Sequence, residues 1–168
     1  ENNMLNKFLN HFGYRFQKNS ESYLPWPTCF HTVDIAVVDI FQNKLLLGQK
    51  PGKDYWVFPG GFTDPVSKND EEDAVRELFE ETDITINPNQ LKYIGNYFVD
   101  DLRYINSKNK IRTHFFVTYL NKCCFNVKAK DDIEFLNWFD IKELEENINI
   151  ISPRHQHLFL ELLKFMGK

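Results

Sequence analysis

The stretch GGFTDPVSKNDEEDAVRELFEETDI, residues 60–84, constrains the fold of this chain more than any other segment. Its second half has the composition of a helix, and at about 3.6 residues per turn that helix would carry its acids on one stripe. The acids of that stripe are Asp73, Glu77, Glu80 and Glu81. An amphipathic helix is therefore predicted, with three apolar residues on the opposite side turned toward a core. Those residues are Val75, Leu78 and Phe79.

Carboxylates crowded in this way repel one another, at a cost of about a few tenths of a kcal/mol for each i, i+4 pair. A divalent cation would reverse that cost, because hard cations such as Mg²⁺ take oxygen ligands. A solvated acidic face is the alternative for the helix taken alone. The preceding WVFPGG favours a binding site, because Gly60 and Gly61 let the backbone approach a ligand closely. An ordinary turn is the alternative for these glycines.

The same stretch resembles the signature of the Nudix hydrolases, G-x5-E-x7-R-E-U-x-E-E-x-G-U, in which U is a bulky aliphatic residue. Gly61 matches the first glycine. The residues that match the second half are Arg76, Glu77, Leu78, Glu80, Glu81 and Ile84. One extra residue precedes Arg76, so the first glutamate of the pattern falls near Ser67 or Lys68. Asp83 replaces the last glycine, and Asp tolerates the left-handed conformation at a helix end.

The resemblance implies an α/β/α sandwich around a mixed β-sheet, and a requirement for Mg²⁺ or Mn²⁺. The reaction that it implies is a metal-assisted attack of water on a pyrophosphate phosphorus. The implied catalytic residues and metal ligands are Glu77, Glu80 and Glu81, with a backbone carbonyl near Gly60 or Gly61 completing the metal shell. In the family the missing first glutamate supports the loop, so the departure concerns loop geometry and rate. Arg76 is expected to pair with acids of the loop.

Nudix enzymes often take an extra glutamate from a distant loop, where it binds metal or activates the water. The segment KAKDDIEFLNW offers Asp131, Asp132 and Glu134 just before a predicted strand. We expect Glu134 to be the proton acceptor, because its longer side chain can reach inward from a strand edge. A polar turn with acids facing solvent is the alternative for all three.

Aromatic and basic residues are candidates for contact with the two ends of a substrate. The predicted substrate-binding residues are Trp56, Phe58, Phe62, Lys50 and Arg112. The three rings could stack on an adenine, and core packing is their alternative. The cations could meet a phosphate, and a solvated loop is the alternative for Lys50 and its neighbour Lys53.

Histidines near these candidates are expected to be structural. His114, two residues after Arg112 with Thr113 between them, is predicted to be a hydrogen-bonded strand residue rather than a general base. His155 and His157 are expected on the last helix, away from the chemistry.

Composition limits the class of protein. With 168 residues, 42% of them hydrophobic, the chain can bury the core of a single compact domain. A net charge of −4 does not favour a nucleic-acid partner. Three cysteines without C-x-x-C spacing argue against a disulfide framework and a zinc site, and they predict a cytoplasmic location. No apolar run approaches the roughly 20 residues that span a bilayer, so no membrane partner is expected.

Hydrophobic patterns predict the other elements of a mixed α/β domain. Strands are predicted at residues 30–40, 45–50, 91–99, 112–120 and 134–141, the first two as a hairpin, and helices at 142–147 and 153–166. Residues 29–168 are predicted to form this domain, and residues 1–28 an N-terminal segment and linker. Residues 4–12 have apolar positions at helical spacing, and YLPWPT at 23–28 is typical of a proline-stiffened linker.

The order of segments around the signature is similar to that of the Nudix domain fused behind a nicotinamide-mononucleotide adenylyltransferase. This resemblance implies hydrolysis of ADP-ribose to AMP and ribose 5-phosphate. It also makes residues 1–24 the tail of an absent adenylyltransferase domain, with a peripheral helix of the same domain as the alternative for residues 4–12. A non-catalytic sensor that binds ADP-ribose or a related NAD metabolite stays open, because the first half of the signature is irregular. A role in mRNA decapping is a third alternative. The expected partner is a small nucleotide, and a monomer and a homo-oligomer both stay open.

Overall fold

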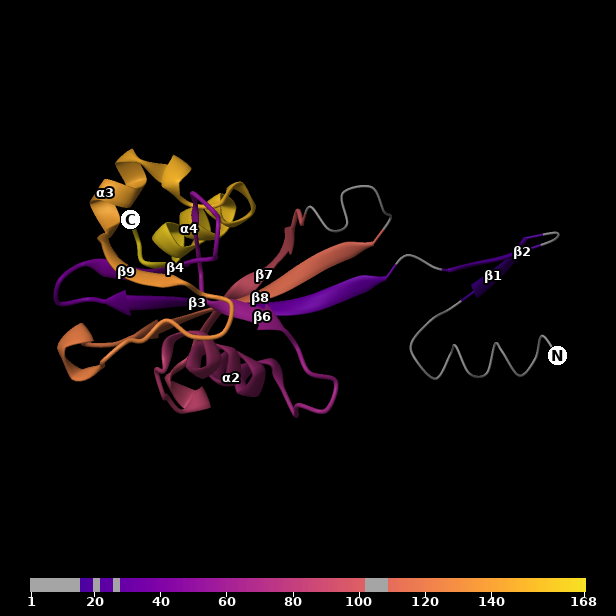
Figure 1. Cartoon of the computed structure of the whole chain (residues 1–168), viewed down its shortest axis with the longest axis horizontal. Helices are drawn as coiled ribbons and strands as arrows, with labels where there is room; N and C mark the ends of the chain where they lie inside the picture. Colours follow the sequence, from indigo (N-terminus) through magenta and orange to yellow (C-terminus); the bar gives the residue numbers. More distant parts are fainter. Residues whose placement is uncertain (1–15, 20–21, 26–27, 102–108) are drawn as a thin grey trace.

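The computed structural model describes residues 16–19, 22–25, 28–101 and 109–168 of the chain (Figure 1). The strands are β1 (Phe16–Asn19), β2 (Ser22–Pro25), β3 (Cys29–Asp39), β4 (Lys44–Gln49), β5 (Trp56–Val57), β6 (Gly60–Phe62), β7 (Lys92–Val99), β8 (Lys110–Tyr119) and β9 (Phe135–Asp140). The α-helices are α2 (Asp70–Thr82), α3 (Ile141–Glu146) and α4 (Pro153–Phe165). The predicted strands, the hairpin and the predicted helices within these described residues are confirmed.

Strand β3 organises a seven-stranded mixed sheet, with the order β5-β4-β3-β8-β7 and with β6 on β3 and β9 on β4. It runs parallel to β8 over ten residue pairs, from Cys29 opposite Lys110 to Val38 opposite Tyr119. The other pairs of this sheet are antiparallel. Eight consecutive residues of β3 are buried. A strand covered on both faces by helices explains why TVDIAVVD lacks the usual alternation of polar and apolar residues.

The alternating side chains of β3 divide the core into two layers. Val33, Ile35 and Val37 pack against α2. Ala36 and Val38 point to the other face, where the buried side chains of α3 and α4 cover them. Figure 1 shows α2 below the sheet and α3 and α4 above it. The predicted α/β/α sandwich is confirmed.

The amino-terminal part of the chain is described only in two short strands. β1 pairs antiparallel with β2, so residues 23–25 of the expected linker lie in a strand. The predicted helix at residues 4–12 lies outside the described residues, and so do residues 26–27 of the linker. The proposed boundary between 1–28 and 29–168 stays a prediction. Among the helices that are described, none is long and apolar enough to cross a membrane.

Local signals fix both ends of α2. The Asn69 side chain accepts a hydrogen bond from the backbone N–H of Glu72, which caps the amino-terminal end. Asp83 ends the helix in the left-handed region with φ 62°, as expected for the residue that replaces the glycine of the signature. Lys130 contacts the Asp83 carboxylate at 2.6 Å.

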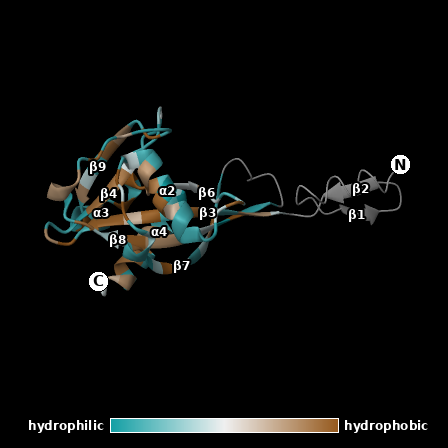
Figure 2. Cartoon of the chain, turned by 90° about the horizontal axis from the view of Figure 1, so that it is seen from below, coloured by the Kyte–Doolittle hydropathy of each residue, from teal (hydrophilic) through white to brown (hydrophobic). Residues whose placement is uncertain are grey.

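The expected core face of α2 is wrong in one residue. Phe79 is 44% exposed, and the Lys130 ammonium lies 4.8 Å from its ring centroid. The residues that are buried along α2 are Asp73, Ala74, Glu77, Leu78, Glu81 and Thr82. They cover an arc of about 180°, at about 100° per residue, and that arc includes three of the four acids. The acidic stripe therefore faces the domain, and the alternative of a solvated face holds only for Glu80. In Figure 2, seen from below, the outward side of α2 is largely hydrophilic.

Two alanine substitutions test this orientation of α2. We expect Leu78→Ala to lower the free energy of unfolding by about 2–5 kcal/mol, because Leu78 is fully buried. Phe79→Ala should cost about 1 kcal/mol or less, since it removes mainly an exposed ring and its contact with a cation. Urea denaturation of both variants measures the difference. Equal losses would contradict the orientation.

Candidate functional site

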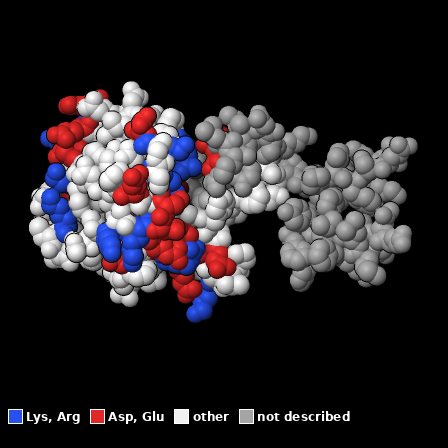
Figure 3. All heavy atoms as spheres, in the orientation of Figure 1, with Lys and Arg blue, Asp and Glu red and all other residues white. Residues whose placement is uncertain are grey.

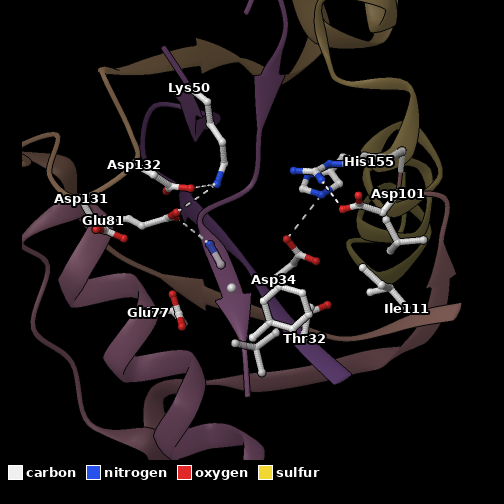
Figure 4. A pocket seen from close by; sticks show the side chains of 16 residues that line it. Thr32, Asp34, Lys50, Glu77, Glu81, Asp101, Ile111, Asp131, Asp132 and His155 are labelled. Carbon is white, nitrogen blue, oxygen red and sulfur yellow. Dashed lines mark hydrogen bonds and ion pairs between the residues drawn. The ribbon is translucent and has the colours of Figure 1, made fainter. Parts of the chain in front are cut away.

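The candidate site lies where β3 changes its antiparallel partner. Residues 32–34 of β3 pair with β6, and residues 37–39 pair with β4. A cavity of about 300 Å³ opens at this point (Figure 4). Residues of α2 and of α4, which cover opposite faces of the sheet, both line it. Where the two glycines of β6 form part of the cavity wall, no side chain projects from that strand.

Both glycines are required by close contacts. Gly60 has φ 153°, and a Cβ atom there would collide with the carbonyl oxygen of Val33. A Cβ atom on Gly61 would collide with the carboxylate of Glu77. The backbone N–H of Gly60 donates a hydrogen bond of 2.8 Å to Glu81 Oε2. The glycine turn is therefore the surface against which the two glutamates pack.

Glu77 and Glu81 are nearly buried acids, 9% and 2% exposed, and both line the cavity. Burial raises the pKa of Glu81 to about 9, and burial also raises the pKa of Glu77. Glu81 has Lys50 Nζ 3.7 Å from its Oε1 atom, and Lys50 also forms an ion pair with Asp132. Burial opposes ionisation of Asp132, but hydrogen bonds from Glu81 and Lys50 outweigh it and lower the pKa of Asp132. Carboxylates held at such unfavourable positions are typical of a binding site for a cation.

Asp73 and Arg76 hold the loop between the glycines and α2. Asp73 Oδ1 accepts hydrogen bonds from the Asp64 backbone at 3.1 Å and from the Ser67 hydroxyl at 2.8 Å. Arg76 donates to the same oxygen at 2.9 Å and to the Phe62 carbonyl at 3.0 Å. Burial by itself would raise the pKa of Asp73, but the hydrogen bonds from Arg76, Asp64 and Ser67 outweigh it and lower that pKa. Ser67, which stands near the glutamate of the signature, thus reaches the helix through Asp73.

Arg76 was expected to pair with acids of the loop, but its ion pairs among the described residues are with acids of α2, two of them glutamates. Its Nη1 atom lies 2.7 Å from Glu77 Oε1 and 2.9 Å from Glu80 Oε2. Burial would lower the pKa of Arg76, but hydrogen bonds to Asp73 and Glu77 raise it further above its ordinary value. Glu80 is exposed and does not line the cavity. Figure 3 shows a band of acidic side chains over the region of α2.

The opposite wall of the cavity is built from residues that the sequence analysis did not select. Asp34 of β3 is 6% exposed, and burial raises its pKa to about 7. His155 of α4 is 4% exposed, and burial lowers its pKa well below the ordinary value. Arg154 lines the cavity and lies 3.0 Å from Asp101. The expectation that His155 lies on the last helix is confirmed, but the expectation that it lies away from the site is wrong.

A second cavity, of about 780 Å³, adjoins the first. The two share Lys50, Asp101, Asp132 and Arg154 as lining residues. The second cavity adds an aromatic and apolar set: Tyr55, Phe98 and Pro153. Cations and acids therefore occupy the passage between a polar cavity and a more apolar one.

The three distant acids differ in position. Asp131 and Asp132 line the cavity, whereas Glu134 is exposed and does not. The backbone N–H of Glu134 bonds to the Gln49 carbonyl at 2.8 Å, at the start of the pairing between β9 and β4. Glu134 was favoured for its reach, but the turn that precedes it presents the two shorter acids to the cavity.

The three candidate rings also differ. Phe58 is 1% exposed and packs on Phe115 with ring centroids 5.0 Å apart, so its faces are taken up by the core. Trp56 packs edge-on against Phe139 and does not line either cavity. Phe62 is 39% exposed and lines the polar cavity. Only Phe62 among these rings keeps a position from which it could contact a ligand.

The basic candidates separate in the same way. Lys50 lines both cavities, and Lys53 lines the second. The Arg112 guanidinium lies 4.4 Å from the ring centroid of Phe98, so it supports a residue of the second cavity without lining it. His157 lines the second cavity.

His114 is part of a separate polar cluster, as expected for a hydrogen-bonded strand residue. Its Nε2 atom lies 3.0 Å from His31 Nδ1, and its Nδ1 atom lies 2.9 Å from Asp70 Oδ2. The three residues line neither cavity.

Comparison with known proteins assigns this arrangement to a family. The family model for the NUDIX domain matches residues 30–162, which include α2, α3, most of α4 and all the residues that line the first cavity. The chain belongs to the Nudix family. An uncharacterized Nudix hydrolase of Bacillus subtilis, YvcI, is 29% identical over 126 residues, which cover 75% of this chain and 75% of that protein.

Solved structures of Nudix proteins share the fold. A bifunctional NMN adenylyltransferase/ADP ribose pyrophosphatase from Francisella tularensis is similar over 83% of this chain, with a TM-score of 0.64 and 24% identity. This chain spans 42% of the length of that protein. The NUDIX domain of Shewanella oneidensis NrtR, complexed with ADP ribose, is similar over 84% of this chain and 90% of its own length, with a TM-score of 0.65 and 17% identity. At these identities the likeness supports the fold.

Members of the Nudix family generally use a divalent metal ion such as Mg²⁺ or Mn²⁺. Among the described residues no three acidic, histidine or cysteine side chains are gathered closely enough to hold an ion, but Glu77 and Glu81 offer buried oxygen ligands of the kind such an ion takes, beside the two glycines. Asp131 and Asp132 add oxygens on the same cavity. Glu80 is exposed and does not line the cavity, so it is placed less well for this role.

The close approach of Gly61 to Glu77 yields a prediction about metal affinity. In Gly61→Ala the new methyl group would displace the Glu77 carboxylate, so we expect the Kd for Mn²⁺ to rise by about 10–100-fold. Electron paramagnetic resonance of free Mn²⁺ measures this constant. Gly167→Ala is the control for a methyl group added away from the cavity, because a Cβ atom there meets no neighbour, although φ 74° strains the backbone at that position. An unchanged Mn²⁺ affinity in Gly61→Ala would show that Glu77 is not a ligand.

Proposed function

We propose that this Nudix domain hydrolyses the pyrophosphate bond of a nucleoside diphosphate derivative, and that its substrate is ADP-ribose, which it converts to AMP and ribose 5-phosphate. The observation that carries the proposal is the pair Glu77 and Glu81, buried against Gly60 and Gly61 in a cavity that Lys50 also lines. A divalent cation bound there would neutralise the phosphate charge and polarise the bond to be broken.

The two adjoining cavities suit a substrate with a pyrophosphate centre and two different ends. Lys50 and Arg154 line both cavities, and their positive charges suit phosphate oxygens at the junction. On one side Phe98 and Tyr55 offer apolar surface for a base. On the other side Asp34 and its neighbours offer polar groups for a sugar. Two structural relatives, a bifunctional NMN adenylyltransferase/ADP ribose pyrophosphatase and a domain complexed with ADP ribose, support the same choice.

Asp132 is the residue that we propose as proton acceptor, in place of Glu134. It lines the cavity, and its lowered pKa keeps the carboxylate ionised and able to accept a proton. When water attacks phosphorus, its proton would pass to Asp132, the bond between phosphorus and the bridging oxygen would break, and the leaving phosphate would take that electron pair. Asp131 is the neighbouring alternative on the same turn.

Binding without cleavage remains the second candidate. Ser67 stands near the position of the glutamate of the signature, and it reaches α2 only through Asp73. A loop held in this way could present the ligand without the geometry that attack requires. The two glutamates that line the cavity favour hydrolysis.

Substitution of one carboxylate tests the catalytic proposal. We expect Glu81→Gln to lower kcat by about 10²–10³, because it removes a negative charge from the site where charge is neutralised in the transition state. Glu72→Gln is the control on the same helix, since the Glu72 carboxylate does not line the cavity and contacts the side chain and the backbone N–H of Lys68. Wild-type turnover in excess chelator, or an unaffected Glu81→Gln variant, would refute metal-assisted hydrolysis.

A substrate panel tests the choice of ADP-ribose. We expect ADP-ribose to have the highest kcat/KM when compared with NAD⁺, nucleoside triphosphates, a diadenosine polyphosphate and capped RNA. Chromatography should find AMP and ribose 5-phosphate as the products. Better hydrolysis of 8-oxo-dGTP or a diadenosine polyphosphate would assign the chain to another branch of the family. Tight binding of ADP-ribose without any product would support the sensor.

A further inference from the structure

Three side chains from distant segments meet on the cavity wall opposite α2. Asp34 of β3 lies on the same face of the sheet as Ala36 and Val38, because strand residues alternate. Thr113 of the parallel neighbour β8 lies on that face too, and its hydroxyl donates to Asp34 Oδ2 at 2.6 Å. His155 reaches the same place from the first turn of α4. The metal-binding proposal uses none of them.

The hydrogen bond at Nδ1 fixes the proton of His155. The backbone N–H of Phe58 donates to His155 Nδ1 at 3.1 Å, so Nδ1 carries a lone pair and no proton. Burial lowers the pKa of the ring, which keeps it neutral. A neutral ring with an unprotonated Nδ1 carries its one proton on Nε2. His155 therefore directs an N–H group toward Asp34, as the dashed line in Figure 4 indicates.

Asp34 and His155 face each other without a hydrogen bond. His155 Nε2 lies 3.6 Å from Asp34 Oδ1, which is beyond the usual range of a hydrogen bond. Oδ1 accepts no hydrogen bond from the other described residues, whereas Oδ2 is bonded to Thr113. An oxygen placed to one side of the line between the two atoms can lie about 2.8 Å from both. The pair is therefore spaced for one small group that both donates and accepts.

A hydroxyl group meets that requirement, as a water molecule would in the absence of ligand, whereas a group that only donates or only accepts does not. It donates its proton to a carboxylate oxygen and accepts from the N–H group at the same time. The ionised form of Asp34 would repel a phosphate oxygen, and an ammonium group would leave the His155 proton unbonded. A metal ion needs a lone pair, which the protonated Nε2 does not have.

We propose that Asp34 and His155 bind one sugar hydroxyl of the substrate, with Thr113 orienting Asp34. This inference rests on the proposed function, and it assigns the recognition of a sugar to the α4 side of the cavity. It makes the chain selective against pyrophosphate substrates that lack that hydroxyl. A site with buried polar groups left unpaired rejects the analogue that lacks their partner.

The test compares ADP-ribose with four analogues, each lacking one hydroxyl at the 2 or 3 position of one of the two riboses. For the wild type, one analogue should lose about 10–150-fold in kcat/KM, the value of a hydrogen bond to a charged group. Asp34→Asn and His155→Gln should process ADP-ribose and that analogue at nearly equal rates. Asp39→Asn is the control, because Asp39 is a buried acid on the same strand that bonds to the backbone of Phe41 and Gln42 away from the cavity. It should discriminate like the wild type.

Two further measurements separate this inference from the function on which it rests. Calorimetric Kd values for the same ligands, measured with Glu81→Gln, report hydroxyl recognition even where no hydrolysis occurs. Mn²⁺ affinity should be unchanged in Asp34→Asn, and a large loss would make Asp34 a metal ligand and overturn the proposal. Hydrolysis or binding with equal preference for all analogues would overturn the hydroxyl site alone. Binding without hydrolysis would refute only the proposed reaction, and no binding of any of these ligands would refute both.

Discussion

The close approach of two glutamates to two glycines is the constraint on which the rest of the structure depends. The Gly60 N–H group bonds to Glu81, and the missing side chain of Gly61 leaves room for Glu77. Acids buried this deeply are costly unless they are bonded or bind a cation, so the contact sets how α2 lies on the sheet. Because the acids and the apolar residues of α2 share one buried face, the same helix contributes both to the core and to the candidate site. The packing of α2 on the sheet therefore determines both the core and the candidate site.

Much of the fold could be predicted because its signals are local. Runs of β-branched residues, the Asn69 cap and the proline that opens α4 each act within a few positions of the chain. The orientation of Phe79 could not be predicted in this way. Amphipathic reasoning assumes that acids face water, and here the sheet accepts them through glycine backbone. Because the acids occupy the buried face of α2, Phe79 points outward, and the Lys130 ammonium lies over its ring.

The half of the candidate site that holds the proposed metal ligands was predictable, and the other half was not. Glu77 and Glu81 lie four residues apart on a single helix, so helical periodicity alone places them on the same face. Asp34 lies 79 residues from Thr113 in sequence, and only the parallel pairing of β3 with β8 joins them. An acid in the middle of a buried strand, as in TVDIAVV, is the signal that could have identified it. No comparable signal marks His155, because a histidine on an amphipathic helix is ordinary.

The change of partner along β3 has a consequence for how this family could diversify. It lets one cavity be reached from both faces of the sheet, so the proposed metal ligands Glu77 and Glu81 and the proposed sugar-contacting groups belong to separate layers. Mutations in the α4 layer can then redirect the enzyme to a new substrate while the α2 layer keeps its inherited chemistry. A short sequence signature would survive such a change intact. Two chains with the same signature can therefore have different substrates, and the residues at positions 34, 113 and 155 are where that divergence would be recorded.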